Sequence, residues 1–172
     1  LPLVATAAAW EAVAGLGLEG VVIKWPNDLM LSGAKLAGLL IHARHGDDVR
    51  AAVGLGVNVA VRPPADELGG LPATSLAEHL GARPWDEVRT ELITGFVSAL
   101  SRFLEQPDAA VELWRRRLVH GEGERLSVRL ASGEILSGEY LGTTPEGHLR
   151  LDAPSGEHVI TGGDVVETAD RS

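Results

Sequence analysis

Residues 21–61 have the sequence VVIKWPNDLMLSGAKLAGLLIHARHGDDVRAAVGLGVNVAV, and this stretch decides the fold. Its first five residues are apolar or β-branched apart from one lysine, which predicts a strand, and Pro26-Asn27-Asp28 predicts the turn that follows. Apolar runs flank Ser32-Gly33, which is typical of a tight hairpin. Gly46-Asp47-Asp48 predicts a second hairpin, leading into a strand over 49–61. Successive hairpins indicate an antiparallel sheet.

Helical patterns surround this stretch. Residues 2–14 are rich in alanine and end before Gly15, Ser75–Leu80 fits a short helix, and a last helix is expected to run through Trp114. Over Trp85–Leu104 the apolar residues recur with helical spacing and are expected to face the core: Val88, Leu92, Ile93, Phe96, Leu100 and Phe103. Trp10, Trp85 and Trp114 are expected in the core as well. The predicted fold is therefore α+β, a mixed, mostly antiparallel sheet with packed helices.

After Gly121 the pattern changes to short strands separated by glycine-containing turns such as Ser132-Gly133. This spacing is typical of a small all-β unit, and we expect an SH3-like barrel. The predicted division is 1–120 for the first domain and 121–172 for the barrel.

Composition excludes several classes of protein. The chain has 172 residues, a formal net charge of −9 and no cysteine, so disulfides and thiolate metal sites are excluded. Dispersed basic residues argue against a nucleic-acid partner. No apolar run approaches the roughly 18 residues that a membrane span needs. His42 and His45 have no adjacent third ligand, so we interpret them as a polar hairpin end.

The strand over 49–61 has two different faces. Valine and leucine side chains at alternate positions, Val53, Leu55, Val57, Val59 and Val61, are expected in the core. Glycines and small residues form the other face: Gly54, Gly56, Asn58 and Ala60. Because glycine weakens a strand, this face either packs closely on a helix or receives a ligand, and both interpretations stay open.

Charged residues cluster in the preceding hairpins. Lys24 interrupts an apolar strand and Lys35 precedes Gly38, while Asn27 and Asp28 lie between the two lysines. Two cations, a carboxylate and amides beside a glycine-lined face would suit a phosphate and a metal ion, although solvated rim residues are the simpler alternative.

Three motifs in this order resemble the biotin–protein ligase family: KWPNDL at 24–29, KLAGLL at 35–40 and VGLGVNVA at 53–60. The resemblance covers essentially the whole chain and implies a class II synthetase-like catalytic domain, of which 1–120 is the C-terminal part. The family's G-R-G-R-x-G-R loop and the helix-turn-helix of some members are not in this sequence. The chain opens without Met in an expected helix, so we expect the loop upstream.

The resemblance implies a reaction in two steps. Biotin's carboxylate attacks the α-phosphate of ATP to give biotinyl-5′-AMP, and a lysine of a biotin carboxyl carrier domain then attacks this anhydride. Lys35 is implied as the cation bridging carboxylate and phosphate, with Lys24 as a second contributor. Asp28 is implied either as acceptor of the amine's proton or as the partner that holds Lys35. The implied substrate and ATP contacts are Asn27, Gly38, Leu40, Gly54, Gly56 and Asn58, with Mg²⁺ entering with ATP near Asn58.

The implied ligands are ATP, Mg²⁺ and biotin, and the implied partner is the carrier domain of a carboxylase. We expect no nucleic-acid or membrane partner and a cytoplasmic location. The resemblance also makes a homodimer one candidate state, because exposed sheet edges often mediate dimers in that family. Two alternatives stay open: a non-catalytic fragment of such a ligase, and a lipoate–protein ligase relative.

Overall fold

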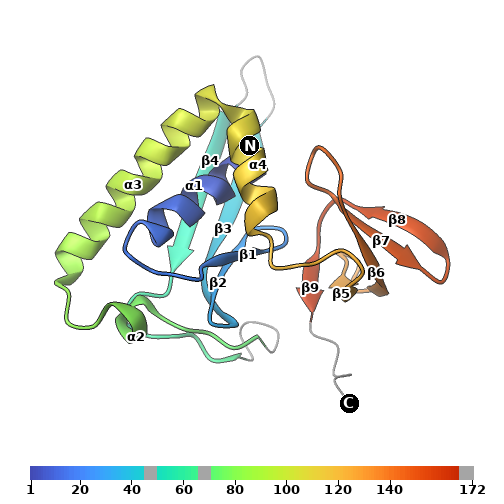
Figure 1. The fold of residues 1–172 in the computed structure, drawn as a ribbon, viewed down its shortest axis with the longest axis horizontal. Coiled ribbons are helices and arrows are strands. Elements are labelled where there is room, and N and C mark those ends of the chain that lie inside the picture. Colours follow the sequence, from blue (N-terminus) through green and yellow to red (C-terminus); the bar gives the residue numbers. More distant parts are fainter. Residues whose placement is uncertain (45–49, 66–70, 167–172) are drawn as a thin grey trace.

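The structure is a computed structural model that describes residues 1–44, 50–65 and 71–166. Two antiparallel sheets organise the chain, with helices packed on the first (Figure 1). The first sheet has the order β1-β2-β3-β4, formed by Val22–Lys24, Asp28–Leu31, Ala34–Arg44 and Arg50–Val57. The expected antiparallel sheet and its packed helices are confirmed. The second hairpin turn, at 46–48, lies outside the described residues.

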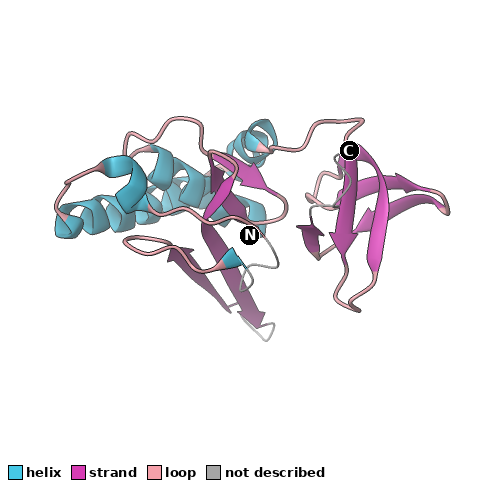
Figure 2. Cartoon of the chain, turned by 90° about the horizontal axis from the view of Figure 1, so that it is seen from below, coloured by secondary structure: helices cyan, strands magenta, loops and turns pink. Residues whose placement is uncertain are grey.

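Helices cover one face of the first sheet, as Figure 2 shows from below. The helices are α1 (Pro2–Ala14), α2 (Leu76–Leu80), α3 (Trp85–Glu105) and α4 (Pro107–Arg117). Small side chains let α1 lie close to its neighbours: Gly95 of α3 packs against Ala12, and α1 also contacts α4. Ile23 and Leu29 turn towards this layer and are fully buried. No helix in the described ranges is long and apolar enough to cross a membrane.

Two residues of α3 that were expected in the core are exposed. Ile93 is 57% exposed, because α3 turns Val88, Leu92, Ala99 and Phe103 inwards and Ile93 lies beside that stripe. Trp85 is also exposed, at the first residue of α3, whereas Trp114 is fully buried as expected and Trp10 is half-buried.

The strand expected over 49–61 ends at Val57, so Val59 and Val61 are exposed rather than in the core. Beyond Val57 the backbone leaves the sheet and bonds to the start of α2, where Leu76 N–H donates to Asn58 O and Ala77 N–H donates to Val59 O.

The second sheet has the order β8-β7-β6-β5-β9, formed by Gly156–Ile160, Leu149–Ala153, Ile135–Thr143, Arg125–Arg129 and Asp164–Val166. Among the described strands β8 and β9 are the two ends of this order and do not pair, so closure into a barrel is not shown. The SH3-like assignment and the division at residue 120 stay predictions. That position lies between α4 and β5.

The first sheet contacts both the end of α4 and the second sheet. Ile23 of β1 bridges to Leu118, and the indole N–H of Trp25 donates to the carbonyl of Gly147, which lies between β6 and β7. The second sheet therefore lies beside the end of the first sheet that β1 and β2 form (Figure 1).

Candidate functional site

The strand register places four of the motif residues in one row across the first sheet. Lys24 pairs with Asp28, Asp28 with Gly38, and Gly38 with Gly56. Directly paired residues project to the same side of a sheet, and the adjacent Ile23 and Leu29 face the helices. This row therefore lies on the face that the helices leave uncovered.

Lys35 reaches the same face through a β-bulge. Strict alternation would put Lys35 and Gly38 on opposite faces, since they are three residues apart. The register shifts between Leu29 and Met30, which pair with Ala37 and Lys35, so Leu36 is an extra residue on β3. A bulge of this kind re-aims a side chain, and here it turns the Lys35 ammonium towards Asp28.

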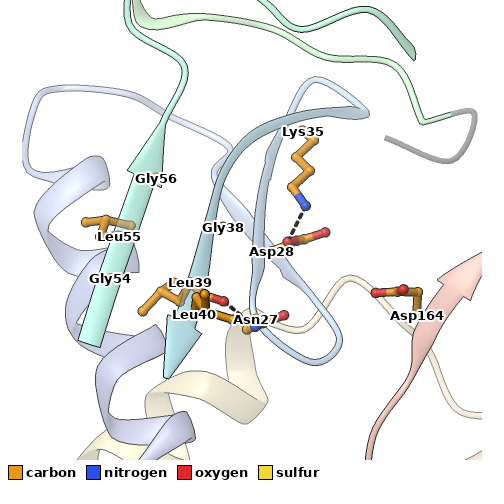
Figure 3. Close-up of a pocket in the computed structure, with 10 residues that line it drawn as sticks. All are labelled: Asn27, Asp28, Lys35, Gly38, Leu39, Leu40, Gly54, Leu55, Gly56 and Asp164. Carbon is orange, nitrogen blue, oxygen red and sulfur yellow. Dashed lines mark hydrogen bonds and ion pairs between the residues drawn. The ribbon is translucent and has the colours of Figure 1, made fainter. Parts of the chain in front are cut away.

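Lys35 and Asp28 form an ion pair over Gly38. The Lys35 Nζ lies 2.6 Å from Asp28 Oδ1, and the two side chains are 23% and 15% exposed (Figure 3). A Cβ on Gly38 would lie 2.9 Å from Asp28 Oδ1 and 3.4 Å from Lys35 Nζ. The missing side chain of Gly38 thus leaves room for the ion pair. The sequence instead suggested that Gly38 lets a ligand approach.

The glycines of β4 leave the backbone bare beside this pair. A Cβ on Gly54 or Gly56 would meet only carbonyl oxygens at ordinary contact distances of 3.6 and 3.8 Å. Leu40, which pairs with Gly54, is 63% exposed. These residues line a hollow of about 520 Å³ together with Asn27, Asp28, Lys35, Gly38, Leu39, Leu55 and Asp164. A flat, partly apolar group could lie on this surface with an anionic group at Lys35.

The side chains of Asn27 and Asn58 both donate hydrogen bonds to backbone carbonyl groups. The Asn27 side chain donates to Leu39 O at 2.6 Å and lines the hollow. The Asn58 side chain does not line it, because its Nδ2 donates to Lys35 O at 3.1 Å and to Thr74 O at 3.0 Å. Asn58 therefore fixes the backbone of Lys35. Its predicted place beside phosphate and Mg²⁺ has no support in this geometry.

Asp164 is a lining residue that the sequence did not reveal. It begins β9 in the second sheet and lies across the hollow from Asp28 (Figure 3). A lone aspartate after Gly162-Gly163 carries no local signal, and only the docking of the second sheet brings it here. Residues 121–172 thus contribute a carboxylate to the hollow, although their sequence shows no catalytic motif.

Lys24 lines a separate, larger hollow of about 730 Å³ between the sheets, with His120 and Glu124 among its other residues. Lys24 is only 7% exposed. Burial is the main cause that lowers the pKa of His120 to about 4; Glu124 opposes this shift, and nearby Lys24 adds a smaller lowering effect. The neutral ring fits its contacts, since its Nε2 accepts the Trp25 backbone N–H at 3.3 Å. The His120 side chain is accordingly buried, with 6% of it exposed.

A protein-built metal centre is not found in the parts of the chain that the structure describes, where no group of three or more histidine or acidic side chains is placed to hold an ion. The hollow nevertheless contains the carboxylates of Asp28 and Asp164. Magnesium commonly binds through one or two carboxylates, water and substrate phosphates, so these residues fit an ion that arrives with a nucleotide.

The helix-backed antiparallel sheet with a second sheet at its side is the fold of solved biotin protein ligases. The apo biotin protein ligase of Aquifex aeolicus superposes with a TM-score of 0.75 at 22% identity, covering 97% of this chain and 74% of that one. The same enzyme in complex with biotin and ATP gives a TM-score of 0.71 at 23% identity, covering 96% and 69%. At these identities the likeness concerns the fold.

Sequence comparison finds similar proteins that are named as biotin ligases. Residues 2–58 match the model of the biotin/lipoate A/B protein ligase family. The chain is 33% identical to the biotin–[acetyl-CoA-carboxylase] ligase of Paracoccus denitrificans over 154 residues, which are 84% of this chain and 62% of that protein. It is 29% identical to the bifunctional ligase/repressor BirA of Bacillus subtilis, over 96% of this chain and 51% of that protein. This chain is therefore similar in sequence to members of the biotin protein ligase family, and it spans between half and two thirds of the length of these two relatives.

Proposed function

We propose that this chain carries the adenylate side of a biotin protein ligase, which attaches biotin to a lysine of a biotin carboxyl carrier domain through biotinyl-5′-AMP. The observation that carries the proposal is the Lys35–Asp28 ion pair, 2.6 Å long, on a bare glycine face. The similar protein of Paracoccus denitrificans is named a biotin–[acetyl-CoA-carboxylase] ligase, and one solved structure with a similar fold holds biotin and ATP.

In the first proposed step a carboxylate oxygen of biotin attacks the α-phosphorus of ATP. The bond from that phosphorus to the bridging oxygen breaks, and pyrophosphate leaves. Two anionic groups must approach each other, and a fixed cation stabilises the charge that builds up between them. An ammonium group has three N–H donors, and only one is needed for Asp28. The others are available to the biotin carboxylate and the α-phosphate.

The nucleotide is proposed to lie on the bare backbone of Gly54 and Gly56, with the exposed Leu40 against its apolar part. Mg²⁺ would enter with the phosphates and neutralise part of their charge, with Asp28 and Asp164 as the nearest carboxylates. Lys24 would add positive charge to the same sheet face from the neighbouring hollow.

In the second proposed step the neutral amine of the acceptor lysine attacks the acyl carbon of the anhydride. The acyl–oxygen bond to phosphate breaks, AMP leaves, and the amine loses a proton. Asp28 is the candidate acceptor for that proton. Its direct contact with Lys35 supports the second role as well, in which Asp28 holds the ammonium in place.

We also propose that a carrier domain is the partner, that the protein is cytoplasmic, and that it forms a homodimer. The first two follow from the proposed reaction, which consumes ATP and modifies a carboxylase subunit. Pairing through a sheet edge is supported by β4, which ends the order of the first sheet among the described strands.

The test measures whether the full-length protein that contains this chain releases pyrophosphate from ATP when biotin or lipoate is added. Biotin with ATP should release pyrophosphate, and a purified carrier domain should then become labelled with biotin. Lipoate with ATP, the matched control, should give no release. Pyrophosphate release with lipoate but not with biotin would favour a lipoate ligase. No release with either substrate would favour a non-catalytic member of the family.

A further inference from the structure

The segment that leads into Asp28 is held from three directions. The buried indole N–H of Trp25 donates to Gly147 O at 2.9 Å. His120 Nε2 accepts the backbone N–H of Trp25 at 3.3 Å, and the Trp114 indole N–H donates to Pro26 O at 3.3 Å. These partners come from the second sheet, the linker between the sheets and α4. The first motif of the sequence is therefore anchored on parts of the chain far from it in sequence.

The turn that carries Gly147 is itself fixed on the helices. It joins β6 to β7 and is closed by a hydrogen bond from Gly147 N–H to Thr144 O at 2.9 Å. Arg115 of α4 donates to Thr144 O and Pro145 O, both at 3.1 Å. Gly147 has φ +86°, and a Cβ on it would lie 2.6 Å from Leu3 Cδ2 of α1. The backbone of this turn thus packs directly against α1.

We propose that Gly147 and Trp25 are positioning residues for the Lys35–Asp28 ion pair, so that the second sheet controls the adenylation step without either residue touching substrate. The inference rests on the proposed function. Asp28 is three residues after Trp25, and Asn27 between them is bonded to β3 through Leu39. Movement of Trp25 would therefore shift the carboxylate that holds Lys35. Misplacement of a reacting group by about 1 Å can lower a rate by about 10².

The first test compares two glycine variants. Gly147→Ala and Gly133→Ala both place alanine at φ +86° in a turn of the second sheet, but nothing lies within 4 Å of a Cβ on Gly133. The two variants therefore have the same backbone strain, and only the new methyl group of Gly147→Ala also collides with the Leu3 side chain. The double variant Leu3→Ala/Gly147→Ala removes that collision and should restore most of the lost activity.

The second test compares two tryptophan variants. Trp25→Phe removes the indole N–H that bonds to Gly147, and Trp10→Phe removes a similar bond, to Val21 O at 2.8 Å, outside this contact. Both variants lose one N–H donor and some ring area.

Three measurements are made on the full-length protein: biotin-dependent pyrophosphate release, hydrogen–deuterium exchange over residues 25–31, and thermal unfolding. For Gly147→Ala and Trp25→Phe we expect kcat to fall by about 10-fold or more with KM for ATP within about 2-fold, because geometry rather than ground-state binding changes. Exchange over 25–31 should rise. Gly133→Ala and Trp10→Phe should retain the wild-type kcat and exchange.

Equal kcat in Gly147→Ala and Gly133→Ala at matched thermal stability would overturn the inference. If Gly147→Ala does not fold, the tryptophan pair decides in the same way. If the wild-type protein releases no pyrophosphate, the proposed function fails. The exchange comparison still decides whether the Gly147 turn fixes residues 25–31.

Discussion

Replacing Gly38 by alanine separates the role of the ion pair from that of the bare glycine face. A Cβ at this position would lie 2.9 Å from Asp28 Oδ1, so the pair with Lys35 cannot keep its geometry. Gly56 pairs with Gly38 across β3 and β4, and a Cβ there would find its nearest atom, Gly38 O, at 3.8 Å. Gly56→Ala is therefore the matched control, with the same chemical change and an intact ion pair.

The two variants should differ in activity far more than in stability. Losing a partly exposed ion pair costs about 0.2–1 kcal/mol, and alanine in place of a strand glycine contributes about 0.5–1 kcal/mol of stability. The free energy of unfolding of Gly38→Ala should thus lie within about 1 kcal/mol of the wild-type value. Displacing the Lys35 ammonium by about 1 Å should lower kcat by up to about 10². Gly56→Ala should instead raise the KM for ATP with kcat unchanged, because only the surface offered to the nucleotide changes.

Urea denaturation and biotin-dependent pyrophosphate release of the two full-length variants provide the assay. A Gly38→Ala variant with wild-type kcat would refute the argument that the space above Gly38 is reserved for the pair. A Gly56→Ala variant with wild-type KM would remove that part of β4 from the ligand surface.

Three further predictions concern pH, nucleic acid and the isolated chain. The pKa of His120 is about 4 in the folded protein, below its ordinary value of 6.5, so the unfolded chain binds more protons between these values; stability should be full above pH 6.5 and fall by roughly 3 kcal/mol as pH drops to 4. Urea denaturation across this range should show the loss, and a His120→Gln variant with the same slope would contradict the assignment. With a net charge of −9 the chain should not bind DNA specifically, and a gel shift that survives competitor DNA would disprove this. Residues 1–172 alone should bind biotin weakly and self-associate, since a pocket without the family's glycine–arginine loop leaves apolar surface exposed; calorimetry and light scattering that show tight binding by a monomer would contradict it.

Local patterns in the sequence were sufficient for most of the fold. Hairpin turns, alternating apolar residues and helical spacing depend on neighbours in the chain, which is why α1, α3 and the hairpin at Ser32-Gly33 were predicted correctly. The strand end at Val57 was not predicted. Val59 and Val61 continue the alternation, but their backbone bonds to α2 instead of to a neighbouring strand.

The candidate site could be predicted only in part. The site residues predicted from the three motifs line one hollow, except Lys24 and Asn58. The bulge at Leu36 places Lys35 on the open face, and simple alternation gives no indication of it. Asp164 and His120 reach their positions through the docking of the second sheet, which depends on contacts between residues far apart in sequence, such as Trp25 and Gly147.

The most direct test of the central claim, that the open sheet face around Lys35 is the adenylation site, is the rate of biotin-dependent pyrophosphate release by a full-length Lys35→Ala variant. Loss of a charge contact to a transition state lowers a rate by about 10²–10³, or about 2.7–4 kcal/mol, and we expect a loss of this size. The unfolding free energy should stay within about 1 kcal/mol of wild type, because the lost pair with Asp28 is partly exposed. A variant that folds and releases pyrophosphate at the wild-type rate would contradict the account and move the chemistry away from this face.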